Sequence, residues 1–259
     1  MVTLTSSVEA RLSLILEELE RRDQVTVNDL SHLLGVSEVT IRSDLARLRT
    51  TRQIFRTRGG ASKPFTAPRE KPVEEASSER EGEKRRIGAC AASLVRSGET
   101  ILLDVGSTTT ELARALSNKL QNVTVVTNGL NIALALEHLP NVTVIVTGGT
   151  LRPLQHSLVN PLGEQVLSSL RADRAFIGCN GVSLEHGVTN LNLPETEIKR
   201  RMVECASEVI VLADHSKLEH ISTARVVPLN RIHRLITDQA ADKKLIKRFR
   251  AAGLTVDLA

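Results

Sequence analysis

The chain has 259 residues, 41% of them hydrophobic, so it can form one large or two ordinary domains with a real core. Its net charge of +4 does not by itself indicate nucleic-acid binding, and an aromatic content of 2% argues against a surface that stacks single-stranded or RNA bases. The three distant cysteines argue against a zinc motif and a disulfide framework. With no signal peptide and no apolar run of 18 residues, we expect a cytoplasmic protein without membrane contact, metal site or cofactor.

Residues 8–60 show the periodicity of three helices followed by a strand-like tail. The first helix begins near Val8, a second is expected to be capped by Asn28 and to end at Gly35, and Ser37 caps a third. The tail "QIFRTRGGA" ends in two glycines. The third helix is expected to turn inward Val39, Ile41, Leu45 and Leu48.

The turn "LGVS" between the second and third helices has the spacing of a helix-turn-helix unit. Residues 42–58 hold six arginines and one acid, whereas the rest of residues 1–60 holds three arginines and seven acids. Such focused charge favours a DNA-binding face over a small helical bundle with a solvated basic surface. The residues expected at DNA are Ser37, Thr40, Arg42, Ser43, Arg47, Arg56 and Arg58.

A linker is expected at residues 62–84. It holds Pro64, Pro68 and Pro72 and then the charged run "EREGEKRR", a composition that buries little and predicts a mobile segment. The expected divisions of the chain are therefore 1–61, 62–84 and 85–259.

From residue 85 onward, apolar strands alternate with helices. Runs such as "VTVVT" and "VTVIV" are typical of a parallel sheet covered on both faces, so we expect an α/β domain with an open, doubly wound sheet. Ligands bind such sheets beyond the carboxyl ends of the strands. Strands are expected at 100–104, 123–127, 142–146, 173–177, 208–213, 234–237 and 254–257, and helices at 86–96, 108–118, 129–138, 161–170, 194–206 and 241–251.

The stretch "DVGSTTTELARAL" at 104–116 turns from a strand through a glycine into a helix. Free N–H groups at a helix start favour an anion, although Ser and Thr are also ordinary caps. Polar residues and glycines after other strands are expected either to contact a ligand or simply to turn the chain, and Glu195 and Lys199 are spaced for a simple helical ion pair. The expected effector-binding residues are Asp104, Gly106, Ser107, Thr108, Thr109, Thr127, Asn128, Gly148, Gly149, Arg152, Asn180, Lys199 and Lys217.

Several motifs occur together in one order along the chain. They are "VSEVTIRSDLARL" (36–48), "RTRGGA" (56–61), "DVGSTT" (104–109), "TN" (127–128), "TGG" (147–149), "DRAFIGCNG" (173–181), "GVTN" (187–190), "ETEIKR" (195–200) and "ADHSK" (213–217). With this set the chain resembles the DeoR family of bacterial transcription regulators from about residue 8 to 257. Ser43, Arg58 and Asn160 depart from the family pattern, which usually has Arg, His and Gly there.

The resemblance implies a winged helix-turn-helix domain followed by an effector domain similar in fold to ribose-5-phosphate isomerase. It implies a repressor of carbohydrate genes that binds double-stranded operator DNA and is controlled by a phosphorylated sugar. It favours a pocket position for Lys199. A homodimer or homotetramer is expected, because two-fold operators need paired readers.

Two other functions fit parts of the pattern. A sugar-phosphate isomerase with an attached DNA-binding domain needs a general base near a carbon-bound proton. The acids expected at the rim, Asp104, Asp173, Glu185 and Asp214, do not give a clear base and oxyanion partner, so no catalytic residue is assigned and no enzyme is expected. A nucleotide switch is disfavoured because "DVGSTT" lacks both the G-x-G-x-x-G spacing and a P-loop lysine.

Overall fold

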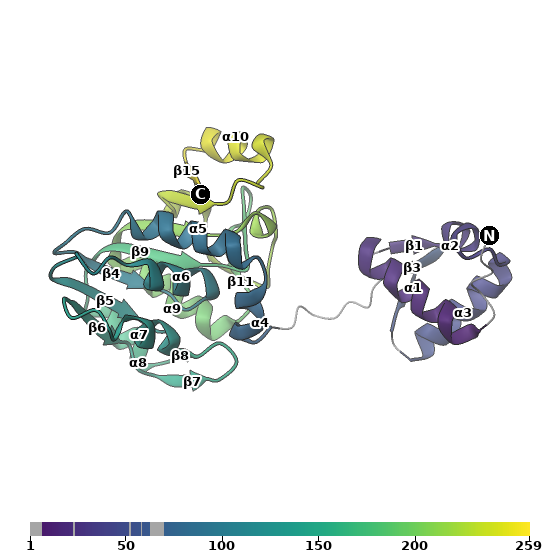
Figure 1. Ribbon diagram of the computed structural model, residues 1–259, viewed down its shortest axis with the longest axis horizontal. Coiled ribbons are helices and arrows are strands. Elements are labelled where there is room, and N and C mark those ends of the chain that lie inside the picture. The colour runs from purple at the N-terminus through teal and green to yellow at the C-terminus, as the bar shows by residue number, and fades with distance from the viewer. Residues whose placement is uncertain (1–6, 23, 52, 58, 63–69) are drawn as a thin grey trace. The chain divides into compact units, whose positions relative to one another are not determined.

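The computed structural model describes residues 7–22, 24–51, 53–57, 59–62 and 70–259. The chain divides into two compact units, Met1–Arg69 and Glu70–Ala259, each of which is described by itself (Figure 1). Across the described ranges, no helix is both long and apolar enough to cross a membrane.

The first unit is a winged helix-turn-helix fold, as expected. Its elements are α1 (Val8–Arg22), β1 (Gln24–Thr26), α2 (Val27–Leu34), α3 (Glu38–Thr50), β2 (Phe55–Thr57) and β3 (Gly60–Ser62). The strands pair antiparallel in the order β1-β3-β2. A buried ion pair joins α1 to α3: Arg11 Nε and Nη2 donate to the two carboxylate oxygens of Asp44 at 2.5 and 2.9 Å. The two helices are therefore fixed by charge as well as by apolar packing.

Two local expectations for this unit are wrong. Thr26 rather than Asn28 caps α2, because its hydroxyl accepts the Asp29 N–H at 3.1 Å. Val39 is 76% exposed, because the buried face of α3 follows Ile41, Leu45 and Leu48 and position 39 lies off it.

Strand β1 was not expected. A Cβ on Gly60 would lie 1.9 Å from the Val25 carbonyl oxygen, so the pairing of β3 with β1 requires glycine at this position.

The second unit is an α/β domain. Its helices are α4 (Val73–Ser78), α5 (Glu81–Ala92), α6 (Ser107–Ala115), α7 (Leu130–Leu136), α8 (Leu162–Ser168), α9 (Leu193–Cys205) and α10 (Lys243–Ala251), with short 3-10 turns η1 (His215–Lys217) and η2 (Leu229–Arg231). Its strands are β4 (Thr100–Leu103), β5 (Val123–Thr127), β6 (Val142–Val146), β7 (Thr150–Arg152), β8 (Ser157–Val159), β9 (Ala172–Gly178), β10 (Gly181–Ser183), β11 (Gly187–Asn190), β12 (Ala206–Leu212), β13 (Ala224–Val227), β14 (Arg234–Thr237) and β15 (Thr255–Leu258).

The main sheet is doubly wound, as expected. Within the described part of this unit, seven parallel strands lie in the order β15-β14-β12-β9-β4-β5-β6, and each overlaps a predicted strand. The chain winds outward from β4 through β5 to β6, and then from β9 in the opposite direction. The strand order therefore reverses between β4 and β9, where sheets of this kind bind ligands.

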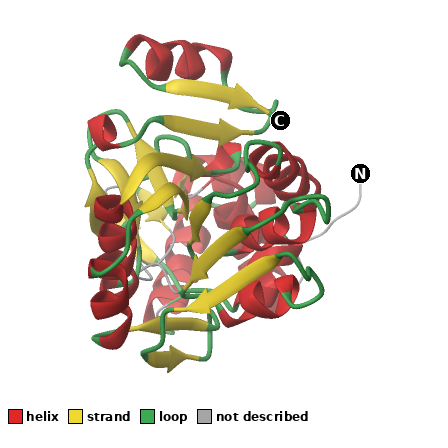
Figure 2. Cartoon of the chain, turned by 90° about the vertical axis from the view of Figure 1, so that its left-hand side faces the viewer, coloured by secondary structure: helices red, strands yellow, loops and turns green. Residues whose placement is uncertain are grey.

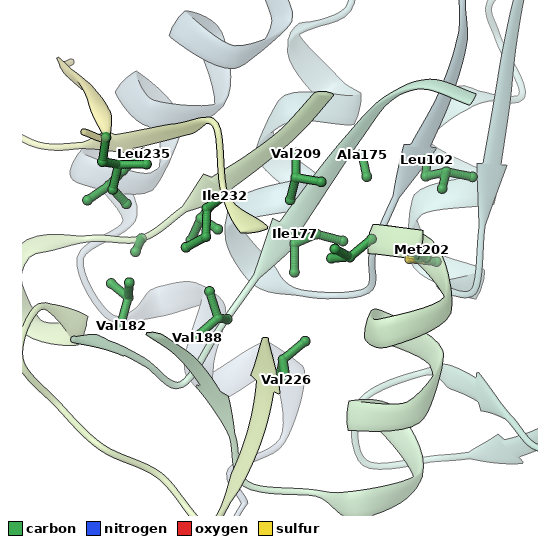
Figure 3. Close-up of a cluster of buried hydrophobic side chains, with 14 of the residues drawn as sticks. Leu102, Ala175, Ile177, Val182, Val188, Met202, Val209, Val226, Ile232 and Leu235 are labelled. Atoms are coloured by element: carbon green, nitrogen blue, oxygen red, sulfur yellow. The ribbon is translucent and has the colours of Figure 1, made fainter. Parts of the chain in front are cut away.

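Helices cover both faces of this sheet (Figure 2). Ile101 and Leu103 pack with α5, α6 and α7, whereas Leu102, between them, faces the opposite side. That side is covered by α8, α9 and a small antiparallel sheet of β10, β11 and β13. Figure 3 shows Ile177 and Met202 in the cluster of buried side chains on this side of the sheet. The small sheet and the β7–β8 hairpin were not expected.

The expected linker is wrong over residues 70–84. Val73 and Lys84 are only 5% and 6% exposed, and the charged run lies at the start of α5. A Cβ on Gly88 would lie 2.6 Å from the Glu111 carbonyl carbon, so this glycine lets α5 pack closely on α6. Close packing of α5 on α6 therefore orders residues 70–84, although their polar composition is typical of a linker. Residues 63–69 of the expected linker lie outside the described residues.

Candidate functional site

A buried ion pair lies where the strand order reverses. Asp104 directly follows β4, and Lys199 of α9 contacts its carboxylate and donates to the Gly178 carbonyl oxygen at 3.1 Å. The Gly178 N–H donates to Asp104 Oδ2 at 3.0 Å. Asp104 is fully buried and Lys199 is 2% exposed. Lys199 therefore does not form the alternative helical pair with Glu195, because α9 turns its ammonium toward the sheet edge.

The Asp104 carboxyl group has an unusual environment. Burial raises the pKa of this group to about 6, against the lowering effects of the Lys199 ammonium and the Gly178 N–H. The second carboxylate oxygen, Oδ1, has no hydrogen-bond partner among the described residues. A buried acceptor of this kind is available to a ligand hydroxyl or to water.

The first turn of α6 lies at the same edge. Gly106 precedes the helix, and its carbonyl oxygen accepts the Thr109 and Thr110 hydroxyls at 3.0 and 2.7 Å. The Thr109 side chain is fully buried and bonded within the turn, so only its backbone is suited to a ligand. The N–H groups of Ser107 and Thr108 lie in the first turn, where helix geometry provides no partner. This turn therefore has the chemistry of an anion site.

Lys84 joins this turn and was missed by the sequence analysis. Because α5 and α6 both begin at the carboxyl edge of the sheet, the Gly88–Glu111 contact places Lys84, one turn earlier, beside the start of α6. Its ammonium donates to the Ala76 carbonyl oxygen in α4. Burial lowers the pKa of Lys84, the Asp214 carboxylate acts in the opposite direction, and the neighbouring Lys217 ammonium lowers the pKa further.

Further charged residues of the site lie in the segment that follows β12. Asp214 accepts the Ser216 N–H at 3.0 Å and so caps η1, which carries half-buried Lys217. Arg80 Nε lies 3.8 Å from the Asp214 carboxylate. Cationic groups from α5, α9 and η1 thus gather around the ends of β4, β9 and β12, as an anionic ligand requires.

Three side chains expected to contact a ligand make hydrogen bonds within the protein. Asn128 is fully buried, its Oδ1 accepts the Val105 N–H at 2.9 Å, and its Nδ2 donates to the Leu158 carbonyl oxygen at 3.4 Å. The Thr127 hydroxyl accepts the Gly129 N–H at 3.0 Å, and Asn180 Oδ1 accepts the Leu191 N–H at 2.8 Å. These bonds hold the loops in place, and in Asn128 they engage both polar atoms of the side chain, which is therefore not available to sugar hydroxyls.

The two glycines after β6 serve the hairpin. Gly149 has φ +119°, and a Cβ there would lie 2.4 Å from the Val159 carbonyl oxygen, so β7 and β8 require a glycine. Gly148 has φ +72°, and a Cβ there would lie 4.0 Å from the Leu162 Cβ, an ordinary contact. Arg152 is not a free surface charge, because it forms ion pairs with Glu70 and Glu195.

Three of the four acids considered as general bases lie apart or are bonded within the protein, and the fourth, Glu185, is exposed in the turn between β10 and β11. Asp173 lies at the opposite edge of the sheet, where it accepts the Thr100 N–H at the start of β4 at 2.8 Å, so its expected place at the rim is wrong. Asp214 caps η1, and Asp104 is paired with Lys199. Among the described side chains, no group of three or more His, Cys, Asp or Glu residues is placed to hold a metal ion.

The expected DNA-contacting residues of α3 lie at its exposed side and start. Ser37 caps the helix by accepting the Thr40 N–H at 3.2 Å, and the two hydroxyl oxygens lie 2.9 Å apart. Arg42 forms an exposed pair with Glu38 at 3.0 Å. Ser43, Arg47 and, on β2, Arg56 are exposed as well, whereas Arg58 lies outside the described residues. Exposed Val39 adds an apolar group to this face, a kind of side chain that contacts thymine methyl groups.

Comparisons with known proteins match both units. Residues 11–64 match the family model of the DeoR-like helix-turn-helix domain, and residues 79–239 match that of the DeoR C terminal sensor domain. The transcriptional regulator GolR of Listeria innocua is 35% identical, with 96% of this chain and 98% of GolR aligned. A putative aga operon transcriptional repressor of Escherichia coli O157:H7 is 37% identical, with 94% and 91% aligned.

Solved structures with a similar arrangement are more distant. Ribose 5-phosphate isomerase A from Methanocaldococcus jannaschii is 20% identical, with 54% of this chain and 55% of the isomerase covered and a TM-score of 0.41. The probable sor operon regulator from Shigella flexneri is 14% identical, with 68% and 92% covered and a TM-score of 0.46.

Proposed function

Because the chain belongs to the DeoR family of transcriptional regulators, we propose that it represses carbohydrate genes and that a phosphorylated sugar bound by residues 70–259 controls its hold on operator DNA. The observation that carries the proposal is the gathering of cationic groups and free helix N–H groups at the point where the strand order reverses. Relatives include one named as a putative aga operon transcriptional repressor.

The phosphate group belongs at the start of α6. The N–H groups of Ser107 and Thr108 and the helix dipole favour negative charge there. Lys84 and Lys217 add two ammonium groups beside this turn. The two ammonium groups repel each other, and this repulsion is one reason for the lowered pKa of Lys84. A doubly charged phosphate group would offset the repulsion.

The sugar end belongs at Asp104 and Lys199. Asp104 Oδ1 is buried without a partner and accepts a hydroxyl, and Lys199 fixes the carboxylate in its charged form. Because this carboxylate is bonded to an ammonium and a backbone N–H, it is suited to bind a hydroxyl rather than to remove a carbon-bound proton. The site is therefore a sensor and not an isomerase.

The DNA end is the exposed face of α3. Arg42 and Arg47 enter the major groove and Arg56 contacts the backbone from the wing, with the protein acting as a homodimer or homotetramer on paired half-sites about 34 Å apart. Association of this kind weakens steeply with salt, because phosphate contacts release counterions.

A thermal-shift screen tests the ligand site. Glucose 6-phosphate, fructose 6-phosphate and ribose 5-phosphate are added to the full chain, with the unphosphorylated sugars as controls, and a binding ligand raises the melting temperature by mass action. Lys84→Met should abolish the shift while DNA binding persists, whereas exposed Lys119→Met should leave the shift unchanged. An undiminished shift in Lys84→Met would show that the phosphate binds elsewhere.

A further inference from the structure

Arg152, at the end of β7, lies between two carboxylates. Its guanidinium forms ion pairs with Glu70 and with Glu195, and Nη1 lies 3.4 Å from the Ser157 hydroxyl. The Ser157 hydroxyl donates to Glu195 at 2.6 Å. The Glu195 side chain is 6% exposed and that of Glu70 is 18% exposed. Glu195 is therefore a fixed partner, and Glu70 is the partner that can leave at lower cost.

Glu70 begins a segment that is docked on the β7–β8 hairpin. The Val73 N–H donates to the Leu154 carbonyl oxygen at 2.9 Å, and His156 Nε2 lies 3.4 Å from the Glu74 carboxylate. The Val73 side chain is buried. Glu70 is also the first residue of the second unit, Glu70–Ala259, called the sensor unit below. The chain that comes from the first unit, Met1–Arg69, called the DNA-reading unit below, therefore enters the sensor unit at this ion pair.

Arg152 is connected to the proposed ligand site through one residue. Glu195 lies one turn before Lys199 in α9, and its charge is close enough to raise the pKa of Asp104. The ion pairs therefore run from Glu70 through Arg152 to Glu195, and the negative charge of Glu195 in turn repels the Asp104 carboxylate that faces the ligand. Two acids share the single positive charge of Arg152, so the Glu70 carboxylate is an exchangeable occupant.

We infer that Glu70 is a built-in competitor of the effector for Arg152. In the effector-free chain, Glu70 holds Arg152 and keeps residues 70–74 docked. The effector, bound at Asp104 and Lys199, takes the guanidinium donors for its own oxygen atoms, and Glu70 is released. This inference rests on the proposed function and adds the route by which the sensor acts on the chain that leads to the DNA-reading unit.

The form in which Glu70 holds Arg152 and the form in which Arg152 is released should differ in their affinity for the effector. A ligand shifts an equilibrium only through its differential affinity, and here the form with Arg152 released is the competent one. If Glu70 holds Arg152 in roughly nine-tenths of the molecules, apparent affinity is lowered about tenfold. Removing the Glu70 charge should remove this penalty and also disconnect binding from DNA release.

The test compares Glu70→Gln with Glu75→Gln in the full chain. Glu75 lies on the same segment and contacts Lys71 at 3.5 Å, away from Arg152. Calorimetric titrations use glucose 6-phosphate, fructose 6-phosphate, ribose 5-phosphate and inorganic phosphate, and fluorescence anisotropy follows DNA from the upstream region of the protein's own gene. Glu70→Gln should bind the active sugar phosphate about tenfold more tightly and lose most of its effect on DNA affinity. The affinity of Glu70→Gln for inorganic phosphate should equal that of the wild type, because phosphate alone tests only the site at the start of α6. Glu75→Gln should match the wild type both in sugar-phosphate affinity and in the effect of the ligand on DNA affinity.

Unchanged or weaker sugar-phosphate binding by Glu70→Gln, with the DNA response intact, would overturn the inference and leave the proposed function standing. Failure of all four probes to bind the wild type would overturn both.

Discussion

Replacing Lys199 with methionine should destabilise the sensor unit strongly. Methionine keeps the length and most of the volume of the side chain but removes the ammonium from the fully buried Asp104 carboxylate. Breaking a buried ion pair by removing one partner costs about 3–5 kcal/mol, because the remaining charge is left uncompensated.

The pKa of Asp104 shows the cost of burying this carboxylate while Lys199 is still in place. Its rise from 3.8 to about 6 corresponds to about 3 kcal/mol at roughly 1.36 kcal/mol per pH unit, even with Lys199 present. Because the folded-state pKa is raised, the folded protein binds more protons than the unfolded chain, and stability falls as the pH rises from 3.8 through about 6. Without Lys199 the pKa of Asp104 should rise further, and this loss should extend to higher pH.

Urea unfolding followed by far-UV circular dichroism measures this loss, since the chain has no Trp or Tyr for fluorescence. Hydrogen exchange in β4 and α9 assigns the transition to the sensor unit. Arg201→Met is the control on the same helix, because Arg201 and Glu204 form an exposed pair at 2.9 Å that is worth less than about 1 kcal/mol. Equal stabilities of Lys199→Met and Arg201→Met at pH 7.5 would refute the reasoning.

Three further variants test other parts of the structure. Asp44→Ala should destabilise the DNA-reading unit by about 3–5 kcal/mol, because Arg11 loses its buried partner, and a thermal transition unchanged by circular dichroism would contradict this. Ser37→Ala should cost about 1 kcal/mol by uncapping α3 and should weaken DNA binding in anisotropy titrations; unaltered affinity and melting would argue against the cap. Gly88→Ala should lower the melting temperature and weaken sugar-phosphate binding together, because its methyl group would lie 2.6 Å from the Glu111 carbonyl carbon, and wild-type ligand affinity would refute the close packing of α5 on α6.

The parallel strands were predictable because burial on both faces leaves continuous apolar runs such as "VTVVT". The pairing of Asp104 with Lys199 was not, because these residues are 95 positions apart and only the strand order and α9 bring them together. Asn128 shows a different limit. A polar residue at a strand end has the same sequence signal whether it binds a ligand or, as here, the backbone of Val105.

Lys84 was missed because a charged run has the composition of a linker. Its burial depends on Gly88, whose missing side chain lets α5 approach α6, and composition carries no information on that contact. The β7–β8 hairpin was missed because its strands have three residues each, too few for a periodic pattern. The Glu70–Arg152 pair was therefore invisible before the structure.

The most direct test of a sugar-controlled repressor is the affinity of the full chain for its upstream DNA with and without the sugar phosphate that stabilises it. We expect salt-sensitive, sequence-selective DNA binding whose affinity the ligand lowers at least about fivefold, and DNA should lower the affinity for the ligand by the same factor. DNA affinity that stays constant at saturating ligand would contradict it.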